Sequence, residues 1–220
     1  MKTDQLRGIT QGFETLRQFA RKPDRKVEHC ELCHRELSSE HPHLIEMKQR
    51  RLICSCDACA MLFSGRAEAK HRRVPRQIRL LANFQMTDAE WDALMIPINL
   101  AFFFQNSQDS RVTALYPSPA GATESLLPLA TWNNIVQSNP ALHSLEPDVE
   151  ALLVNRVGQA RGATAAQYYI VPIDACYKLV GLIRIHWRGF SGGTEVWQEI
   201  GAFFSHLRSR AEIVTERIHA

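Results

Sequence analysis

Five of the six cysteines lie between Cys30 and Cys59, and their spacing suits a metal site. Cys30 and Cys33 form one Cys-x-x-Cys pair, and Cys56 and Cys59 form a second pair after 22 intervening residues. Such a pair directs two thiolates at one ion, and two pairs complete the tetrahedron that zinc prefers. Because four thiolates leave no open coordination position, these cysteines predict a structural rather than a catalytic zinc site.

Neighbouring donors provide alternatives to this ligand set. Cys54 stands two residues before Cys56 and is an alternative to it. His34 and His43 are alternative nitrogen ligands, as is His41, although histidines in loops are commonly solvated. If Cys56 opens a helix, Cys54 ends the preceding strand, so we predict that its thiol is spare. Thiolate-bound iron or an iron–sulfur cluster is the alternative to zinc.

The residues between the two pairs indicate how the site is built. Residues 44–46 and 52–54 are expected to form a hairpin around the polar turn at Lys48–Arg51. A helix is expected after Cys59, with the second ligand pair in its first turn. The sequence therefore predicts a treble-clef-like module consisting of a knuckle, a hairpin and a helix.

The chain divides into three predicted parts. Residues 1–26 form an amphipathic helix that ends near Pro23, residues 27–74 form the zinc module, and residues 75–220 form an α+β domain. Charge supports the second boundary, since residues 1–79 hold 17 Lys and Arg against 10 Asp and Glu, and the remainder 9 against 13. Residues 66–79 hold a basic run that favours either a solvated linker or contact with nucleic-acid phosphates.

The third part mixes strands and helices without regular alternation, which predicts an antiparallel or mixed sheet. Strands are expected over 97–106, 111–117, 151–157, 168–172 and 177–187, and a helix over 125–136. A turn at 117–125 should lead into that helix. Thr194 is expected to cap a final helix whose apolar repeat runs from Trp197 to Ile218.

Few residues of the third part suggest chemistry. Cys176 has no neighbouring base or cation and is expected to be a buried structural thiol. Trp187, Arg188 and Phe190 lead into a glycine-rich loop and are predicted to bind a partner, the alternative being that the aromatics are core. Because the sequence lacks recognisable nucleophile triads, spaced carboxylate pairs and cofactor motifs, we expect a protein that is not an enzyme.

Composition indicates the compartment. The hydrophobic fraction of 45% and charged fraction of 22% are ordinary for a globular protein, and the apolar runs are shorter than a bilayer span. The first residues lack the apolar core of a secretory signal, and clustered thiols are typical of intracellular metal sites. We expect a cytoplasmic protein without a membrane span.

Several segments together resemble a known family. These are Cys30–Cys33, the stretch Leu52–Phe63, and the segments Tyr116–Ser125, Pro147–Val154, Val171–Tyr177 and Trp187–Gly193. They resemble an uncharacterised bacterial family encoded near nickel–iron hydrogenase operons. The resemblance implies an accessory protein for hydrogenase assembly or maturation, which binds a hydrogenase subunit or a maturation factor. A zinc-dependent nucleic-acid-binding regulator and a thiolate-iron or redox protein are the alternatives.

Overall fold

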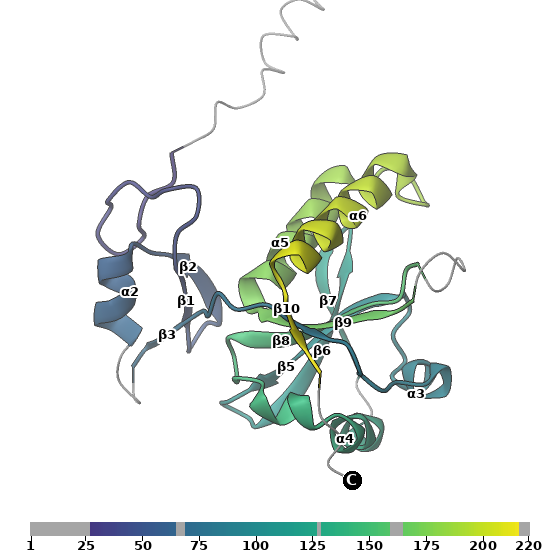
Figure 1. Ribbon diagram of the computed structural model, residues 1–220. Helices are drawn as coiled ribbons and strands as arrows, with labels where there is room; N and C mark the ends of the chain where they lie inside the picture. The colour runs from purple at the N-terminus through teal and green to yellow at the C-terminus, as the bar shows by residue number, and fades with distance from the viewer. Residues whose placement is uncertain (1–26, 65–68, 127–128, 159–164, 216–220) are drawn as a thin grey trace, which may run out of the picture.

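A computed structural model describes residues 27–64, 69–126, 129–158 and 165–215. The amphipathic helix predicted for residues 1–26 lies outside these ranges. Figure 1 shows a small module beside a larger mixed sheet with helices above and below it. None of the helices in the described ranges is long and apolar enough to cross a bilayer.

The small module contains the elements that the cysteine spacing predicted. Strands β1 (His43–Glu46), β2 (Arg51–Cys54) and β3 (His71–Arg73) form an antiparallel sheet in the order β2-β1-β3. Helix α2 (Asp57–Ser64) follows the hairpin. Leu44 and Ile53 pair across β1 and β2 and pack with Ala60 of α2 in a small core.

The larger part is a seven-stranded sheet in the order β10-β4-β9-β8-β5-β6-β7. All neighbouring strands are antiparallel except β10 and β4. Its strands are β4 (Arg79–Leu81), β5 (Leu100–Asn106), β6 (Arg111–Ser118), β7 (Gly121–Ser125), β8 (Glu150–Asn155), β9 (Gln167–Pro172) and β10 (Glu212–Val214). The predicted α+β class with a mixed sheet is confirmed.

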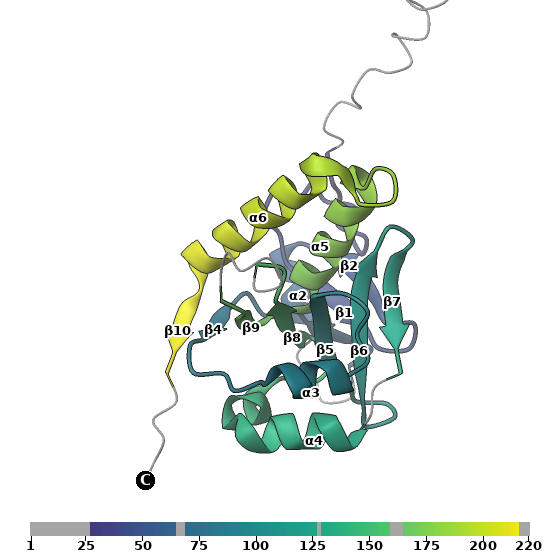
Figure 2. The same ribbon diagram turned by 90° about the vertical axis from the view of Figure 1, so that its right-hand side faces the viewer.

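Helices cover both faces of this sheet, as Figure 2 shows. On one face lie α5 (Ile173–His186) and α6 (Gly193–Arg210), and on the other lie α3 (Asp88–Ala93), α4 (Leu129–Ser138) and the short 3-10 helix η1 (Pro140–Ser144). Central strands are therefore buried on both sides. Leu153 of β8 belongs to the core under α5 and α6, whereas Leu152 belongs to the core over α3 and α4.

The module and the larger sheet share one hydrophobic core. Ile45 of β1 and Val74, which follows β3, are each 3% exposed and belong to the cluster formed by the sheet with α5 and α6. Polar side-chain contacts also cross between the two parts. Arg72 of β3 contacts Asp148 at 3.2 Å, and His43 of β1 contacts Asp174 of α5 at 2.7 Å.

The prediction of a strand over residues 177–187 is wrong, because these residues belong mostly to helix α5. Five of its apolar residues stand at odd positions and so resemble the two-residue period of a strand, namely Tyr177, Leu179, Ile183, Ile185 and Trp187. Buried residues of α5 instead follow the helical spacing, namely Ile173, Cys176, Leu179, Val180 and Ile183. Ile185, which a strand would place on the same face as Leu179 and Ile183, is 65% exposed.

Two further predictions fail locally. The segment 117–125, expected to be a turn, forms the β6–β7 hairpin. Gly121 in this hairpin has a φ of 133°, a conformation that residues with a side chain rarely adopt. The final helix ends at Arg210 rather than continuing toward Ile218, and its N-cap is Gly192, so Thr194 makes no cap. The following residues form β10, whose parallel pairing with β4 joins distant segments.

Candidate metal centre

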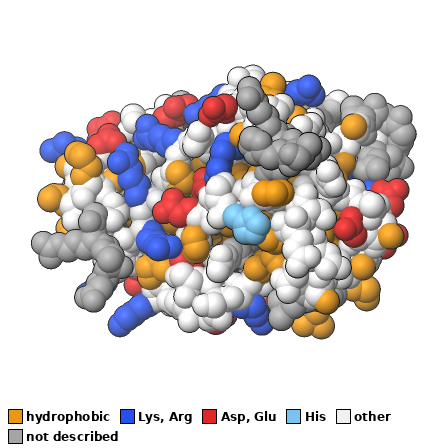
Figure 3. Space-filling model, turned by 60° about the horizontal axis from the view of Figure 1, so that its bottom comes forward, with side chains coloured by type: hydrophobic (Ala, Val, Ile, Leu, Met, Phe, Trp, Pro, Cys, Tyr) orange, Lys and Arg blue, Asp and Glu red, His pale blue; other side chains and the backbone are white. Residues whose placement is uncertain are grey.

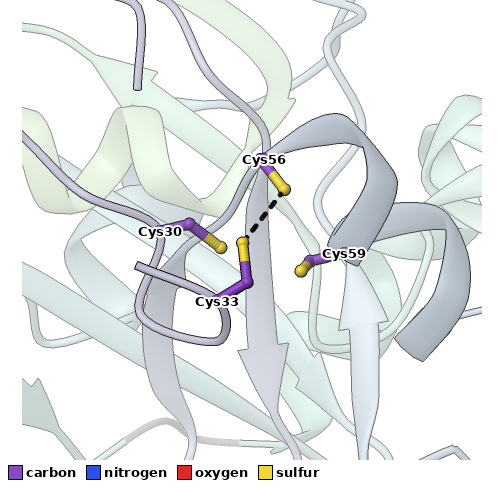
Figure 4. A group of neighbouring side chains, drawn as sticks. All are labelled: Cys30, Cys33, Cys56 and Cys59. Carbon is purple, nitrogen blue, oxygen red and sulfur yellow. Dashed lines mark hydrogen bonds between the residues drawn. The ribbon is translucent and has the colours of Figure 1, made fainter. Parts of the chain in front are cut away.

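The first cysteine pair lies in a tight turn before the hairpin. The Cys30 amide donates to the Arg35 carbonyl at 2.7 Å, and the His34 amide donates to the Cys30 carbonyl at 2.8 Å. His34 takes a φ of 61°, so the chain reverses immediately after Cys33. This reversal lets both sulfurs of the pair point to the same side, as Figure 4 shows.

The second pair stands where β2 passes into α2. Cys56 immediately precedes the helix and Cys59 lies in its first turn. The Ala60 amide donates to the Cys56 carbonyl at 2.9 Å, which fixes Cys56 at the start of the helical ladder. Residues three apart lie on the same side of a helix, so the sulfurs of Cys56 and Cys59 both face Cys30 and Cys33.

The four sulfurs converge on one point, as expected from the spacing (Figure 4). They all lie within 4.8 Å of one another, and the sulfurs of Cys33 and Cys56 are 3.7 Å apart. A zinc ion with Zn–S bonds of about 2.3 Å requires sulfur–sulfur edges of about 3.8 Å. A disulfide needs about 2.05 Å, and all six cysteines are free thiols. The arrangement therefore fits a tetrahedral ion.

Hydrogen bonds and burial shift the pKa values of two of these thiols in opposite directions. Burial opposes ionisation of Cys30, but backbone amides of Cys56, Leu32 and Cys33 outweigh it and lower the pKa of this thiol to about 6. Burial, followed by the other three sulfurs, raises the pKa of Cys59 to about 12. The backbone thus favours a negative charge at the centre, but all four thiolates coexist only with a cation between them.

A family model described as a family of unknown function (DUF5947) matches residues 29–211. The chain belongs to this family. Comparisons with curated proteins and with solved structures find no match. The matched range contains all four cysteines and the larger sheet, so this DUF5947 protein combines a cluster able to hold a metal ion with the mixed sheet described above.

The alternative ligands do not join the four cysteines. His34 is exposed and belongs to neither of the donor groups found among the described residues. His43 and Cys54 belong instead to a second group with His41. All three residues are donors that the sequence offers as alternative ligands, but the sequence does not indicate that they lie together.

Cys176 of α5 is fully buried in the core beneath α5 and α6. Burial, with a smaller effect from Asp174, raises the pKa of this thiol well above its usual value. We predict that Cys176→Ser destabilises the fold by about 1–3 kcal/mol, because it buries a hydroxyl among apolar groups. Thermal denaturation and elemental analysis check this, with Cys176→Ala as control. Loss of bound metal would contradict the structural role.

The residues proposed to bind a partner occupy the loop between α5 and α6. Trp187 is half-buried, its ring centroid 6.2 Å from that of Trp197, and its indole N–H donates to the Gly189 carbonyl at 2.8 Å. The Arg188 guanidinium donates to the Ile185 carbonyl at 2.7 Å near the end of α5. Phe190 is fully exposed. Trp187 therefore anchors the loop while Phe190 projects from it.

Arginines of the basic run form hydrogen bonds within the protein. Arg72 donates to the Pro147 carbonyl at 2.9 Å, and Arg79 donates to Glu150 at 2.7 Å and to the Ser144 hydroxyl at 2.8 Å. Arg66 lies outside the described residues. On the face seen in Figure 3, basic side chains are interspersed with acidic and apolar ones rather than forming a continuous basic surface.

Proposed function

We propose that this protein is a non-enzymatic accessory protein, an adaptor whose four-cysteine centre holds a structural zinc ion in a treble-clef-like module. The main support is the convergence of four sulfurs within 4.8 Å of one another, with those of Cys33 and Cys56 at 3.7 Å, close to the edge of about 3.8 Å in a zinc tetrahedron. Ligation by all four leaves no coordination position for a substrate. The ion then serves to hold the turn, the hairpin and α2 together.

Metal analysis tests the identity of this ion. We expect purified protein to contain zinc without iron and to be colourless, because thiolate-bound iron absorbs visible light and zinc does not. Cys56→Ser should lose the zinc of the four-cysteine centre. A coloured protein containing iron at unit stoichiometry would replace the zinc proposal with an iron site.

The proposed partner is a hydrogenase subunit or a maturation factor of a nickel–iron hydrogenase. This context is supported by the resemblance of the cysteine segments and of Tyr116–Ser125 and Trp187–Gly193 to a family encoded near hydrogenase operons. The direct experiment is affinity capture with tagged protein from hydrogen-metabolising cells, followed by identification of the bound proteins. Enrichment of hydrogenase components is the expected result, and their absence would contradict a role in hydrogenase assembly.

The α5–α6 loop is the proposed contact surface. An apolar cavity of about 500 Å³ lies beside it, lined by Trp187, Trp197 and Ile200 together with residues around Pro97 and Pro117. Exposed aromatics next to such cavities are typical of binding hot spots. The loop conformation requires glycine at position 192, because φ there is 86° and a Cβ would lie 2.8 Å from the Val196 side chain. The aromatic side chain of Phe190 is thus held outward on a defined backbone.

We predict that Phe190→Ala leaves stability within about 0.5 kcal/mol of the parent, since the side chain makes little contact with the protein. Capture of the partner should weaken by about 2 kcal/mol or more, which is roughly thirtyfold in affinity. Leu62→Ala on α2 is the control, because Leu62 is also an exposed apolar residue. Equal capture by Phe190→Ala and Leu62→Ala would place the contact elsewhere.

A further inference from the structure

A second set of donors lies at the end of the β1–β2 hairpin. One ligand atom each from His41, His43 and Cys54 falls within 4.8 Å of the others. The two imidazole centroids are 4.8 Å apart. These residues are separate from the four-cysteine centre, and the adaptor role proposed above gives them no task.

Strand pairing explains why these side chains meet. His43 of β1 is opposite Cys54 of β2 in the antiparallel register. The Ser55 amide donates to the Pro42 carbonyl at 3.0 Å, which identifies His43 and Cys54 as a pair that does not itself exchange hydrogen bonds. In such pairs the side chains approach most closely. His41 precedes His43 by two residues, so extended backbone places both rings on one side.

Hydrogen bonds fix which nitrogen of His43 is free. Its Nδ1 lies 2.7 Å from a carboxylate oxygen of Asp174, in the first turn of α5. Because the carboxylate accepts, Nδ1 carries the hydrogen and Nε2 retains its lone pair. A carboxylate behind a histidine in this way is the usual second-layer support of a metal-binding imidazole.

His41 is prepared in the same manner. Its Nδ1 lies 2.9 Å from the Ser38 carbonyl, which accepts a hydrogen bond and leaves the lone pair on Nε2. The side chain is 6% exposed, and Nε2 is buried without a hydrogen-bond partner. A buried acceptor without a partner costs free energy, and a bound cation would satisfy it.

The site borders a cavity of about 520 Å³ between the module and the larger sheet. His41, His43 and Asp174 line it, as do residues of α5 and α6 such as Lys178 and His206. The Glu28 carboxylate, 3.6 Å from His41 Nδ1, would help to balance the charge of a bound cation. His41 and His43 therefore border open space on one side.

We propose that His41 Nε2, His43 Nε2 and Cys54 Sγ bind a second zinc ion whose fourth position faces this cavity and holds water. Two imidazoles and one thiolate are donors that zinc accepts, and three protein ligands with one exchangeable position are the pattern of open zinc sites. The Cys54 thiol is then a ligand of the second ion rather than a spare group. This inference goes beyond the adaptor role, which requires only the closed site.

Metal stoichiometry tests the second site. Full-length protein is purified with zinc, desalted and analysed for zinc per chain, and circular dichroism confirms folding. We expect two zinc ions in the parent and one in Cys54→Ser and in His41→Ala. His34→Asn is the matched control, because it changes an exposed histidine of the same module and asparagine tolerates the positive φ. One zinc in the parent, or two in both variants, would overturn the proposal.

Cobalt substitution tests the open position independently of the variants. Cobalt(II) in the second site should change its visible absorption when azide is added, because azide can take the exchangeable position. The remaining cobalt in Cys54→Ser, bound by four thiolates, should not respond. A parent protein that holds two cobalt ions and shows no response to azide would overturn the open position. Cys56→Ser tests the four-cysteine site separately, since it should lose that ion. A failure of the second-site proposal can therefore be told apart from a failure of the proposed zinc adaptor.

Discussion

Cys56→Ser is expected to remove the ion of the four-cysteine centre and to destabilise the whole chain by several kcal/mol. Structural zinc contributes apparent free energies of about 10–16 kcal/mol to the folding of small modules. The module has few other stabilising contacts of its own, since its small core consists of Leu44, Ile53 and Ala60 with Leu32 at the edge. Three short strands and one eight-residue helix cannot bury enough apolar surface alone.

The effect should extend into the larger sheet. Ile45 and Val74 belong to the core beneath α5 and α6, so unfolding of β1 and β3 withdraws both from it. Withdrawing a buried aliphatic residue from a core typically costs about 2–5 kcal/mol. The contacts of His43 with Asp174 and of Arg72 with Asp148 would be lost at the same time.

Thermal denaturation followed by circular dichroism, with zinc analysis of the same samples, checks this result. Cys54→Ser is the comparison, because it also replaces a module thiol by a hydroxyl, removes only the second ion proposed above and leaves the four cysteines intact. We expect a much larger fall of Tm in Cys56→Ser than in Cys54→Ser. An unchanged Tm in a zinc-depleted Cys56→Ser would show that the ion does not hold the fold.

Local sequence sufficed to predict the elements of the module because its four clustered cysteines lie within 30 residues and their spacing indicates the turn, the hairpin and the helix. The strands β5 and β6 were predicted for a similar reason, since a short polar turn joins two apolar runs. The segment that became α5 was ambiguous. Its apolar residues fit both a two-residue and a helical period, and only packing against the sheet decides between them.

The second donor group could not be predicted because it depends on tertiary contacts. The register of β1 and β2 brings His43 beside Cys54, and α5 supplies Asp174 from 131 residues further along the chain. A strand predicted over 177–187 gives no indication that Asp174 faces the module. Strand β10 escaped prediction in the same way, since it forms only by pairing with β4.

Arg79→Ala is expected to destabilise the fold by about 3 kcal/mol, the lower end of the range for breaking a buried ion pair. The side chains of Arg79 and Glu150 are 17% and 6% exposed, and their charged atoms are 2.7 Å apart. Without Arg79, the Glu150 carboxylate stays buried, and among the described residues the Glu146 amide at 3.0 Å is its remaining partner. The remaining exposure of Arg79 keeps the loss at the low end.

Chemical denaturation of Arg79→Ala and Arg76→Ala provides the comparison, because Arg76 belongs to the same basic run but is exposed. Arg76→Ala should change stability by less than about 0.5 kcal/mol. The double variant Arg79→Leu with Glu150→Leu should recover part of the loss, since it removes the unpaired charge. If Arg79 were instead a phosphate ligand, its alanine variant would keep its stability and lose salt-dependent affinity for DNA. That outcome would support a nucleic-acid-binding regulator, an alternative that the internal hydrogen bonds of Arg72 and Arg79 disfavour.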